Sequence, residues 1–178
     1  TSWITASPGQ SNMSLEVQTL SLPDQQEYKG QPFPLALEVK TTNLEEACAW
    51  ARDNATDVEA KASEHGAVLM RGLPLASPED FDAVVTAFGF PNFSYEESLS
   101  NAYRINYTPR VFSANEAPPE VTIFLHHEMA QTPIYPSKLL FFCQTAPDEG
   151  GATPICRSDI LWEHLCDQHA DFAAACRD

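Results

Sequence analysis

The stretch that decides the fold is the run Ile123-Phe124-Leu125-His126-His127-Glu128-Met129. Its first part is apolar and rich in strand-forming residues, so we predict a strand that ends in three polar side chains. Successive side chains of an extended segment point to opposite faces, which places His126 and Glu128 together and His127 on the other side. We therefore predict His126 and Glu128 as metal ligands, with His127 supporting them through packing or hydrogen bonds.

An imidazole and a carboxylate on one face supply two members of the 2-His-1-carboxylate ligand set. This set leaves open positions on Fe(II), where substrate and dioxygen can bind together. We expect the third ligand to be a distant histidine. His164 and His169 belong to a predicted helical segment, and we expect both at the surface. The alternative for the whole pattern is an exposed polar end of a strand.

The composition limits the partners and the location. The chain has 178 residues, 43% of them hydrophobic, which is enough for the core of one domain. Ten Lys and Arg against twenty-five Asp and Glu give a net charge of −15, which argues against nucleic acid and anionic membranes as partners. No run approaches eighteen apolar residues, so we expect no spanning helix. Five cysteines, an odd number without a C-x-x-C pair, indicate free thiols in an intracellular compartment, the cytoplasm or an organelle.

The first half of the chain predicts alternating strands and helices. Residues 1–13 are small and polar and are expected to be a flexible tail, and residues 14–178 are expected to form the N-terminal portion of a single domain. We predict strands over 15–20, 35–39 and 67–71, with Gly30, Pro32 and Pro34 marking a loop between the first two. We predict one long helix or two short ones over 44–64, with Asn43 and Glu46 as a capping box and Gly66 as the end. We predict a further helix from Pro78 to Phe88.

The second half predicts a loop followed by strands. Residues 91–119 mix prolines with aromatic and polar residues, which is typical of a binding loop. The apolar runs 121–125 and 138–143 predict two strands, and we expect Tyr135, Phe141 and Phe142 to pack in the interior. Cys143 and Cys156 are expected to be buried on strands. Gly150 and Gly151 predict a turn, Ser158 caps a helix over 159–166, and a short helix follows within 167–178.

Residues 104–165 resemble the TauD/TfdA superfamily of Fe(II)- and 2-oxoglutarate-dependent dioxygenases, in its clavaminate synthase-like and syringomycin-hydroxylase-like branch. Four stretches carry the resemblance: Ala114-Asn115-Glu116 with Pro118-Pro119, Leu125 to Ala130, Tyr135 to Cys143 with Ala146-Pro147, and Gly150-Gly151-Ala152-Thr153-Pro154-Ile155. The resemblance implies an α+β fold built on a double-stranded β-helix, or jelly roll. It also implies a dioxygenase that binds Fe(II) and uses 2-oxoglutarate as co-substrate.

The resemblance assigns roles to particular residues. His126 and Glu128 match the family's first histidine and its acidic ligand, with Glu in place of the more common Asp. Thr153 matches the threonine that hydrogen-bonds a carboxylate of 2-oxoglutarate. Halogenating relatives carry a small residue at the acidic position, so Glu128 favours hydroxylation or a related oxidation of a small-molecule substrate. Arg104, Asn115 and Glu116 are candidates for the substrate pocket, with loop-stabilising hydrogen bonds as the alternative.

The chain departs from the family in one respect. The family's distal histidine and its 2-oxoglutarate-binding arginine lie downstream of the Gly-Gly-x-Thr-Pro helix, and Arg157 and Arg177 are poor candidates for that arginine. We therefore expect a jelly roll that is incomplete at the C-terminus. Three explanations stay open: a piece of a longer chain, a split protein completed by another chain, or a truncated relative without catalysis. The alternatives to the enzyme are a non-catalytic structural or interaction subunit and a cupin-like metal-binding protein with other chemistry.

Overall fold

A computed structural model describes residues 15–93, 102–118 and 120–177 of the chain. The predicted tail over residues 1–13 lies outside the described residues. The elements, in chain order, are β1 (Glu16–Leu20), β2 (Gln26–Tyr28), β3 (Gln31–Phe33), β4 (Leu35–Lys40), α1 (Leu44–His65), β5 (Val68–Arg71), α2 (Pro78–Ala87), α3 (Ser158–Gln168) and α4 (Ala170–Ala175). The predicted mixture of helices and strands is confirmed, and the bounds of β1, β4, α1, β5 and α2 agree with the predictions to within about two residues.

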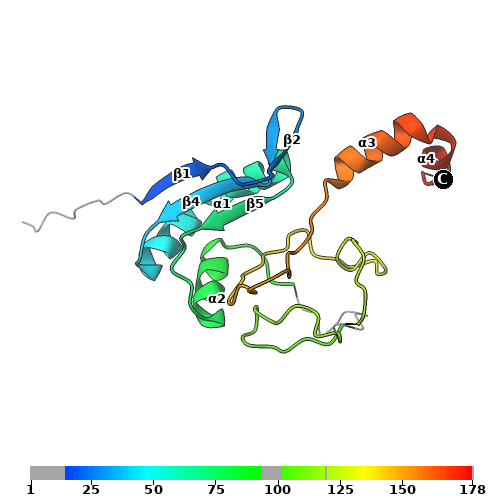
Figure 1. The fold of residues 1–178 in the computed structure, drawn as a ribbon. Helices are drawn as coiled ribbons and strands as arrows, with labels where there is room; N and C mark the ends of the chain where they lie inside the picture. The colour runs from blue at the N-terminus through cyan, green and yellow to red at the C-terminus, as the bar shows by residue number, and fades with distance from the viewer. Residues whose placement is uncertain (1–14, 94–101, 119, 178) are drawn as a thin grey trace, which may run out of the picture.

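The strand β4 is the centre of a three-stranded sheet. It pairs antiparallel with β1, where Val17 lies opposite Val39, and parallel with β5, where Leu37 lies opposite Met70. Its neighbours satisfy the main-chain hydrogen bonds on both edges, and four of its side chains are buried: Leu35, Ala36, Leu37 and Val39. The helix α1 connects β4 to β5 and lies against one face of the sheet (Figure 1).

The ends of α1 are specified by its sequence. The side chain of Asn43 accepts a hydrogen bond from the backbone N–H of Glu45 at 2.9 Å, which confirms the predicted cap. The predicted capping box is wrong. The carboxylate of Glu46 instead accepts from Thr41 Oγ1 at 2.7 Å, because that hydroxyl lies within its reach. The helix ends at Gly66, which has a φ of 81°, as expected of a left-handed C-cap.

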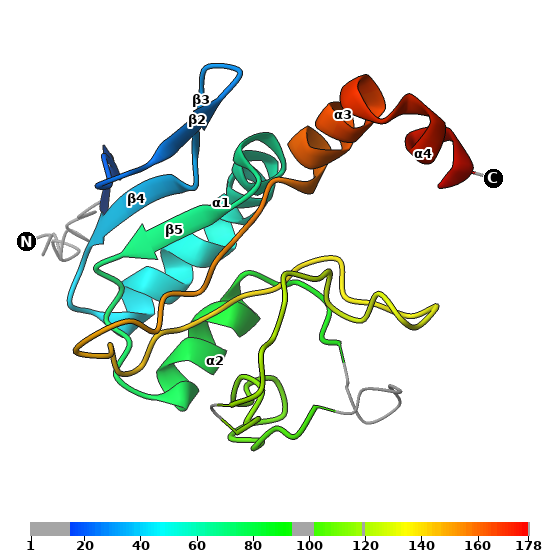
Figure 2. The same ribbon diagram turned by 45° about the vertical axis from the view of Figure 1, so that its right-hand side comes forward.

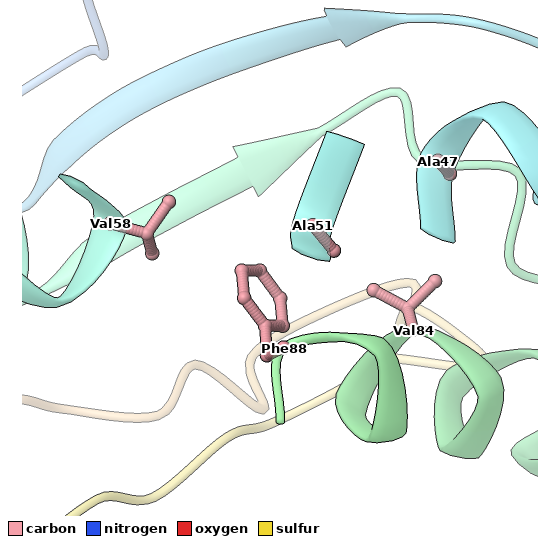
Figure 3. Packing of buried hydrophobic residues seen from close by; sticks show 5 residues of the cluster. All are labelled: Ala47, Ala51, Val58, Val84 and Phe88. Carbon is pink, nitrogen blue, oxygen red and sulfur yellow. The ribbon is translucent and has the colours of Figure 1, made fainter. Parts of the chain in front are cut away.

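The core lies between α1 and α2. Figure 3 shows Ala47, Ala51 and Val58 of α1 facing Val84 of α2 and Phe88 just after it. Both alanines are fully buried, and their small side chains leave room for the ring of Phe88. The capping box at the start of α2 pairs Ser77 with Asp80 and sets the direction in which the helix leaves the preceding loop.

The segment between β1 and β4 is a hairpin and not a plain loop. The strands β2 and β3 pair antiparallel, and Lys29 and Gly30 between them have φ values of 53° and 78°. Two consecutive residues with positive φ are the geometry of a tight two-residue hairpin turn. Pro32 is tolerated in β3 because an edge strand does not need every N–H for pairing.

The predicted strands over residues 121–125 and 138–143 do not form in the described part of the chain. A strand needs a neighbour to accept and donate its main-chain hydrogen bonds, and no described segment lies alongside either run as a paired strand. The side chains are correspondingly open to solvent: Phe124 is 79% exposed, Phe141 71% and Tyr135 65%. The expectation of interior packing is therefore wrong for Tyr135 and Phe141, whereas the half-buried Phe142 packs on Phe81 with ring centroids 5.5 Å apart.

The described residues between 102 and 157 are irregular and run beside α2, with α3 and α4 projecting beyond them (Figure 2). The loop predicted over 91–119 is confirmed for its described residues, which contain one isolated bridge between Asn106 and Phe112. Cys143 and Cys156 are exposed and lie outside strands, so their predicted burial is wrong. All five cysteines are free. None of the described helices has the length and apolarity needed to cross a membrane.

Candidate metal centre

The candidate metal centre is a pair of side chains that converge where an extended segment enters a turn. Nε2 of His126 lies 3.8 Å from Oε2 of Glu128. The histidine side chain is 56% exposed, whereas the glutamate side chain is only 16% exposed. The structure thus brings together the two residues that the alternation of side chains predicted, although the segment is not a strand.

The turn that follows has a buried residue in an unusual backbone conformation. Met129 has a φ of 60° and is 3% exposed, and the N–H of Ala130 donates to the carbonyl of His127 at 3.2 Å. A left-handed backbone at a residue other than glycine costs about 1 kcal/mol or more and persists where the surroundings hold it. Here the burial of the Met129 side chain holds the turn, so Glu128 is directed back toward His126.

The hydrogen bond of His126 determines which ring nitrogen is available. Nδ1 of His126 lies 2.7 Å from the carbonyl oxygen of Phe124. A carbonyl can only accept, so Nδ1 carries the proton and the neutral ring presents a lone pair at Nε2. Nε2 is also the ring nitrogen that faces Glu128. This hydrogen bond orients the ring as histidine ligands of metal sites are oriented.

The separation of the two ligand atoms fits one metal ion. Ligand atoms about 2.1 Å from a divalent metal lie about 3 Å apart at a right angle and about 4 Å apart when opposite. The 3.8 Å between Nε2 of His126 and Oε2 of Glu128 falls within this range. The described residues contain no group of three or more His, Cys, Asp or Glu side chains that could hold a metal. The pair therefore supplies part of a ligand set.

Arg104 contacts the second oxygen of the same carboxylate. Its Nη2 donates to Oε1 of Glu128 at 3.0 Å, and the two side chains are 17% and 16% exposed. From the sequence, Arg104 was a candidate for the substrate pocket, with a loop-stabilising hydrogen bond as the alternative. Its pairing with a carboxylate 24 positions away could not be predicted from the local pattern. The only sequence signal for this pair was that Arg104 and Glu128 have opposite charges, and the chain has 25 Asp and Glu residues that could equally pair with an arginine.

His127 makes contact with α3. Its Nε2 lies 2.7 Å from Oγ of Ser158, so the His127 ring is engaged away from the pair of His126 and Glu128. The prediction that Ser158 caps α3 is wrong: Arg157 occupies the N-cap position without a side-chain cap, and Ser158 is the first residue of the helix. The hydroxyl is directed to His127 instead.

The other predicted site residues lie on exposed loops. Thr153, Asn115 and Glu116 are exposed, and within the described residues none of them makes a side-chain hydrogen bond to His126 or Glu128. Glu116 uses its backbone N–H to bond the carbonyl of Tyr103 at 3.1 Å. Their predicted roles toward 2-oxoglutarate and substrate stay predictions.

The remaining histidines lie apart from the pair. His164 and His169 are exposed, as predicted, on α3 and at its C-cap. His65 is buried at the end of α1, where Nδ1 lies 2.9 Å from the carbonyl of Pro32. It therefore joins α1 to the hairpin.

Comparison with known proteins decides the family. The sequence pattern of the family described as taurine catabolism dioxygenase TauD, TfdA family matches residues 29–176. The chain belongs to the TauD/TfdA family. The resemblance seen over residues 104–165 is thereby confirmed, and the family match extends it upstream through α1 to β4 and β3.

Two relatives show how the chain compares in length. A clavaminate synthase-like protein of Arabidopsis thaliana is 37% identical over 158 residues, which are 85% of this chain and 47% of that protein. The dapdiamide synthesis protein DdaC of Enterobacter agglomerans is 32% identical over 93 residues, which are 52% of this chain and 28% of that protein. The chain thus spans about half the length of the first relative and less of the second.

Proposed function

We propose that this chain provides the first metal-binding segment of an Fe(II)- and 2-oxoglutarate-dependent dioxygenase that hydroxylates or otherwise oxidises a C–H bond of a small molecule. The observation that carries the proposal is the convergence of Nε2 of His126 and Oε2 of Glu128, 3.8 Å apart, in a member of the TauD/TfdA family. Imidazole and carboxylate are ligands that suit Fe(II), and a site with one such pair still has room for a further histidine.

The residues of the chain have distinct tasks in this proposal. His126 and Glu128 bind the metal, and the hydrogen bond from His126 Nδ1 to the carbonyl of Phe124 leaves Nε2 as the ring nitrogen that faces the metal. Thr153 donates its hydroxyl to a carboxylate of 2-oxoglutarate, a role that rests on its place in the Gly-Gly-x-Thr-Pro stretch. When bound, Fe(II) with 2-oxoglutarate and dioxygen supplies the oxidising power for attack on a C–H bond. Glu128 occupies the position that halogenating relatives leave open, which favours hydroxylation over halogenation.

The proposal requires groups beyond the described residues. These residues contain no third ligand near His126 and Glu128. We propose that a distal histidine and a cationic group for 2-oxoglutarate come from a longer chain or from another chain, which completes a double-stranded β-helix. The exposed apolar runs over 121–125 and 138–143 support this idea, because pairing with further strands would bury side chains such as Phe124 and Phe141.

Anaerobic titration with Fe(II) and 2-oxoglutarate tests the function directly. We expect a weak visible charge-transfer band in the complete protein, and its loss in His126→Ala and Glu128→Ala. His164→Ala is the matched control, since His164 is an exposed histidine on α3. We expect the 178-residue chain alone to show little or no turnover. An unchanged band in His126→Ala would contradict the assignment of the metal site.

A structural or interaction subunit is the second candidate. It is favoured by the large exposed apolar side chains of the second half and by the incomplete ligand set of the described residues. If the complete protein binds a partner chain through Phe124 and Phe141 but never develops the charge-transfer band, the subunit role replaces the enzyme. The two measurements therefore separate the two functions.

A further inference from the structure

We infer that Arg104 is a positioning residue that holds the carboxylate of Glu128 for binding a metal through one oxygen. This inference rests on the proposed function and deepens it. Nη2 of Arg104 bonds Oε1 of Glu128 at 3.0 Å, while Oε2 is the oxygen that faces Nε2 of His126 at 3.8 Å. Each oxygen of the carboxylate thus has its own neighbour.

The backbone on either side of Arg104 is fixed. The N–H of Ser113 donates to the carbonyl of Ile105 at 2.8 Å, and the N–H of Glu116 donates to the carbonyl of Tyr103 at 3.1 Å. Oγ of Ser113 also accepts from the N–H of Ile105 at 2.9 Å. Tyr103 and Ile105, which flank Arg104, are therefore both hydrogen-bonded to the returning segment, residues 112–116, where the chain comes back alongside them. The backbone position from which the Arg104 side chain extends is thus defined.

The guanidinium itself is held by an aromatic ring. The central carbon of the Arg104 guanidinium lies 5.5 Å from the centre of the Phe112 ring, and Phe112 belongs to the same returning segment. A guanidinium over an aromatic face gains a cation–π attraction, and its planar shape stacks well there. The Arg104 and Glu128 side chains are 17% and 16% exposed, so water screens their ion pair only in part.

The hydrogen bond from Arg104 limits how the Glu128 carboxylate can bind a metal. The terminal torsion of a glutamate is broad, so a carboxylate without a partner rotates easily and can bind a metal through both oxygens. Two-oxygen binding would occupy a coordination position that a co-substrate needs. A donor on Oε1 restricts that rotation and favours metal binding through Oε2, the oxygen that faces His126. Outer partners that orient ligands in this way typically contribute about 10–100-fold to metal affinity.

The same contacts distinguish positioning from substrate binding. The predicted substrate role would require Arg104 to present its donors to a ligand, whereas the structure directs Nη2 to Glu128 in a mostly buried ion pair. An anionic substrate would have to displace that carboxylate. A role in positioning Glu128 requires only the hydrogen bond that Arg104 already makes.

Metal titration of full-length protein variants tests the inference without measuring turnover. The probes are Co(II), whose visible bands report the number of ligands, and Fe(II) under anaerobic conditions. We expect Arg104→Met to weaken metal binding about 10–100-fold and to change the Co(II) spectrum. Arg104→Lys should give intermediate values, because one ammonium cannot reproduce the fixed guanidinium. The matched control is Arg110→Met, which removes another arginine of the same loop and should bind Co(II) as the wild type does.

A double mutant separates positioning from a general effect on stability. In a Glu128→Ala background, Arg104→Met should cause no further loss of Co(II) affinity, because the group through which Arg104 acts is gone. Wild-type affinity together with a wild-type Co(II) spectrum in Arg104→Met overturns the inference and leaves the proposed function intact. Absence of metal binding in the wild type overturns both. If Arg104→Met fails to fold, Arg104→Lys decides: values equal to wild type overturn the inference, and intermediate values support it.

Discussion

Nη1 of Arg157 donates to the backbone carbonyl of Glu64 over 3.3 Å, which joins the segment before α3 to the last turn of α1. The two residues are 93 positions apart in the sequence. A carbonyl in the last turn of a helix has no partner within the helix, and a cation there also interacts favourably with the helix dipole. This hydrogen bond attaches the second half of the chain to the unit formed by β4, α1 and β5.

Gly66→Ala should destabilise the protein at this junction. Gly66 has a φ of 81°, and a Cβ placed on it would lie 2.2 Å from Cδ of Arg157. The backbone strain alone costs about 1–2 kcal/mol, and displacement of the arginine should add to it. Urea unfolding measures the loss. Gly89→Ala is the matched control: its φ is 73° with no atom within 4 Å of the new Cβ, so a larger loss there than at Gly66 would contradict the role of Arg157.

Asp159→Asn should remove an acid-sensitive contribution to stability. The hydrogen bonds from the Arg157 guanidinium lower the pKa of Asp159 from 3.8 to about 2. A carboxyl with a lowered pKa stabilises the fold above about pH 4 and loses this contribution as the pH falls toward 2. Because the Asp159 side chain is 57% exposed, we expect at most about 1 kcal/mol at neutral pH. The unfolding free energies of wild type and variant in urea should approach each other as the pH falls and converge below about pH 2. A constant difference down to about pH 2 would refute the pairing.

Phe88→Ala should destabilise the first half of the chain strongly. Phe88 is 7% exposed and packs on the buried alanines of α1, so the substitution leaves a cavity between the two helices. Such losses are about 3–5 kcal/mol. Phe172→Ala is the control, because Phe172 is 58% exposed on α4 and should change the unfolding free energy by less than about 0.5 kcal/mol. Equal effects of the two substitutions would mean that the core does not lie between α1 and α2.

Ser158→Ala should loosen the turn that carries the candidate metal ligands. Oγ of Ser158 lies 2.7 Å from Nε2 of His127, between the two predicted ligands in the sequence. An exposed hydrogen bond of this kind contributes about 0.5–1.5 kcal/mol. We expect Ser158→Ala and His127→Ala to lower Co(II) affinity by similar factors, and the double mutant to add little to either. Additive losses in the double mutant would show that the two residues act independently.

Local signals were sufficient for the first half of the fold. The apolar run of β4, the cap at Asn43 and the left-handed stop at Gly66 act within a few residues of the backbone that they specify, so each could be predicted from sequence. The capping box with Glu46 failed because Thr41, only two residues before the cap, competes for its carboxylate. The hairpin of β2 and β3 was missed because prolines suggested a loop, although the positive φ of Lys29 and Gly30 makes a tight turn.

The candidate site shows the same division. Alternation of side chains along an extended chain was enough to predict that His126 and Glu128 face each other, because that spacing depends on local backbone geometry alone. The partner of Glu128, the partner of His127 and the attachment of residue 157 to α1 were decided by tertiary structure. Arg104, Ser158 and Glu64 lie 24, 31 and 93 positions from the groups that they bond. Several side chains of similar chemistry could serve as each partner, and the packing of the intervening chain decides which one does. A pattern within a short stretch of sequence contains no information about that packing.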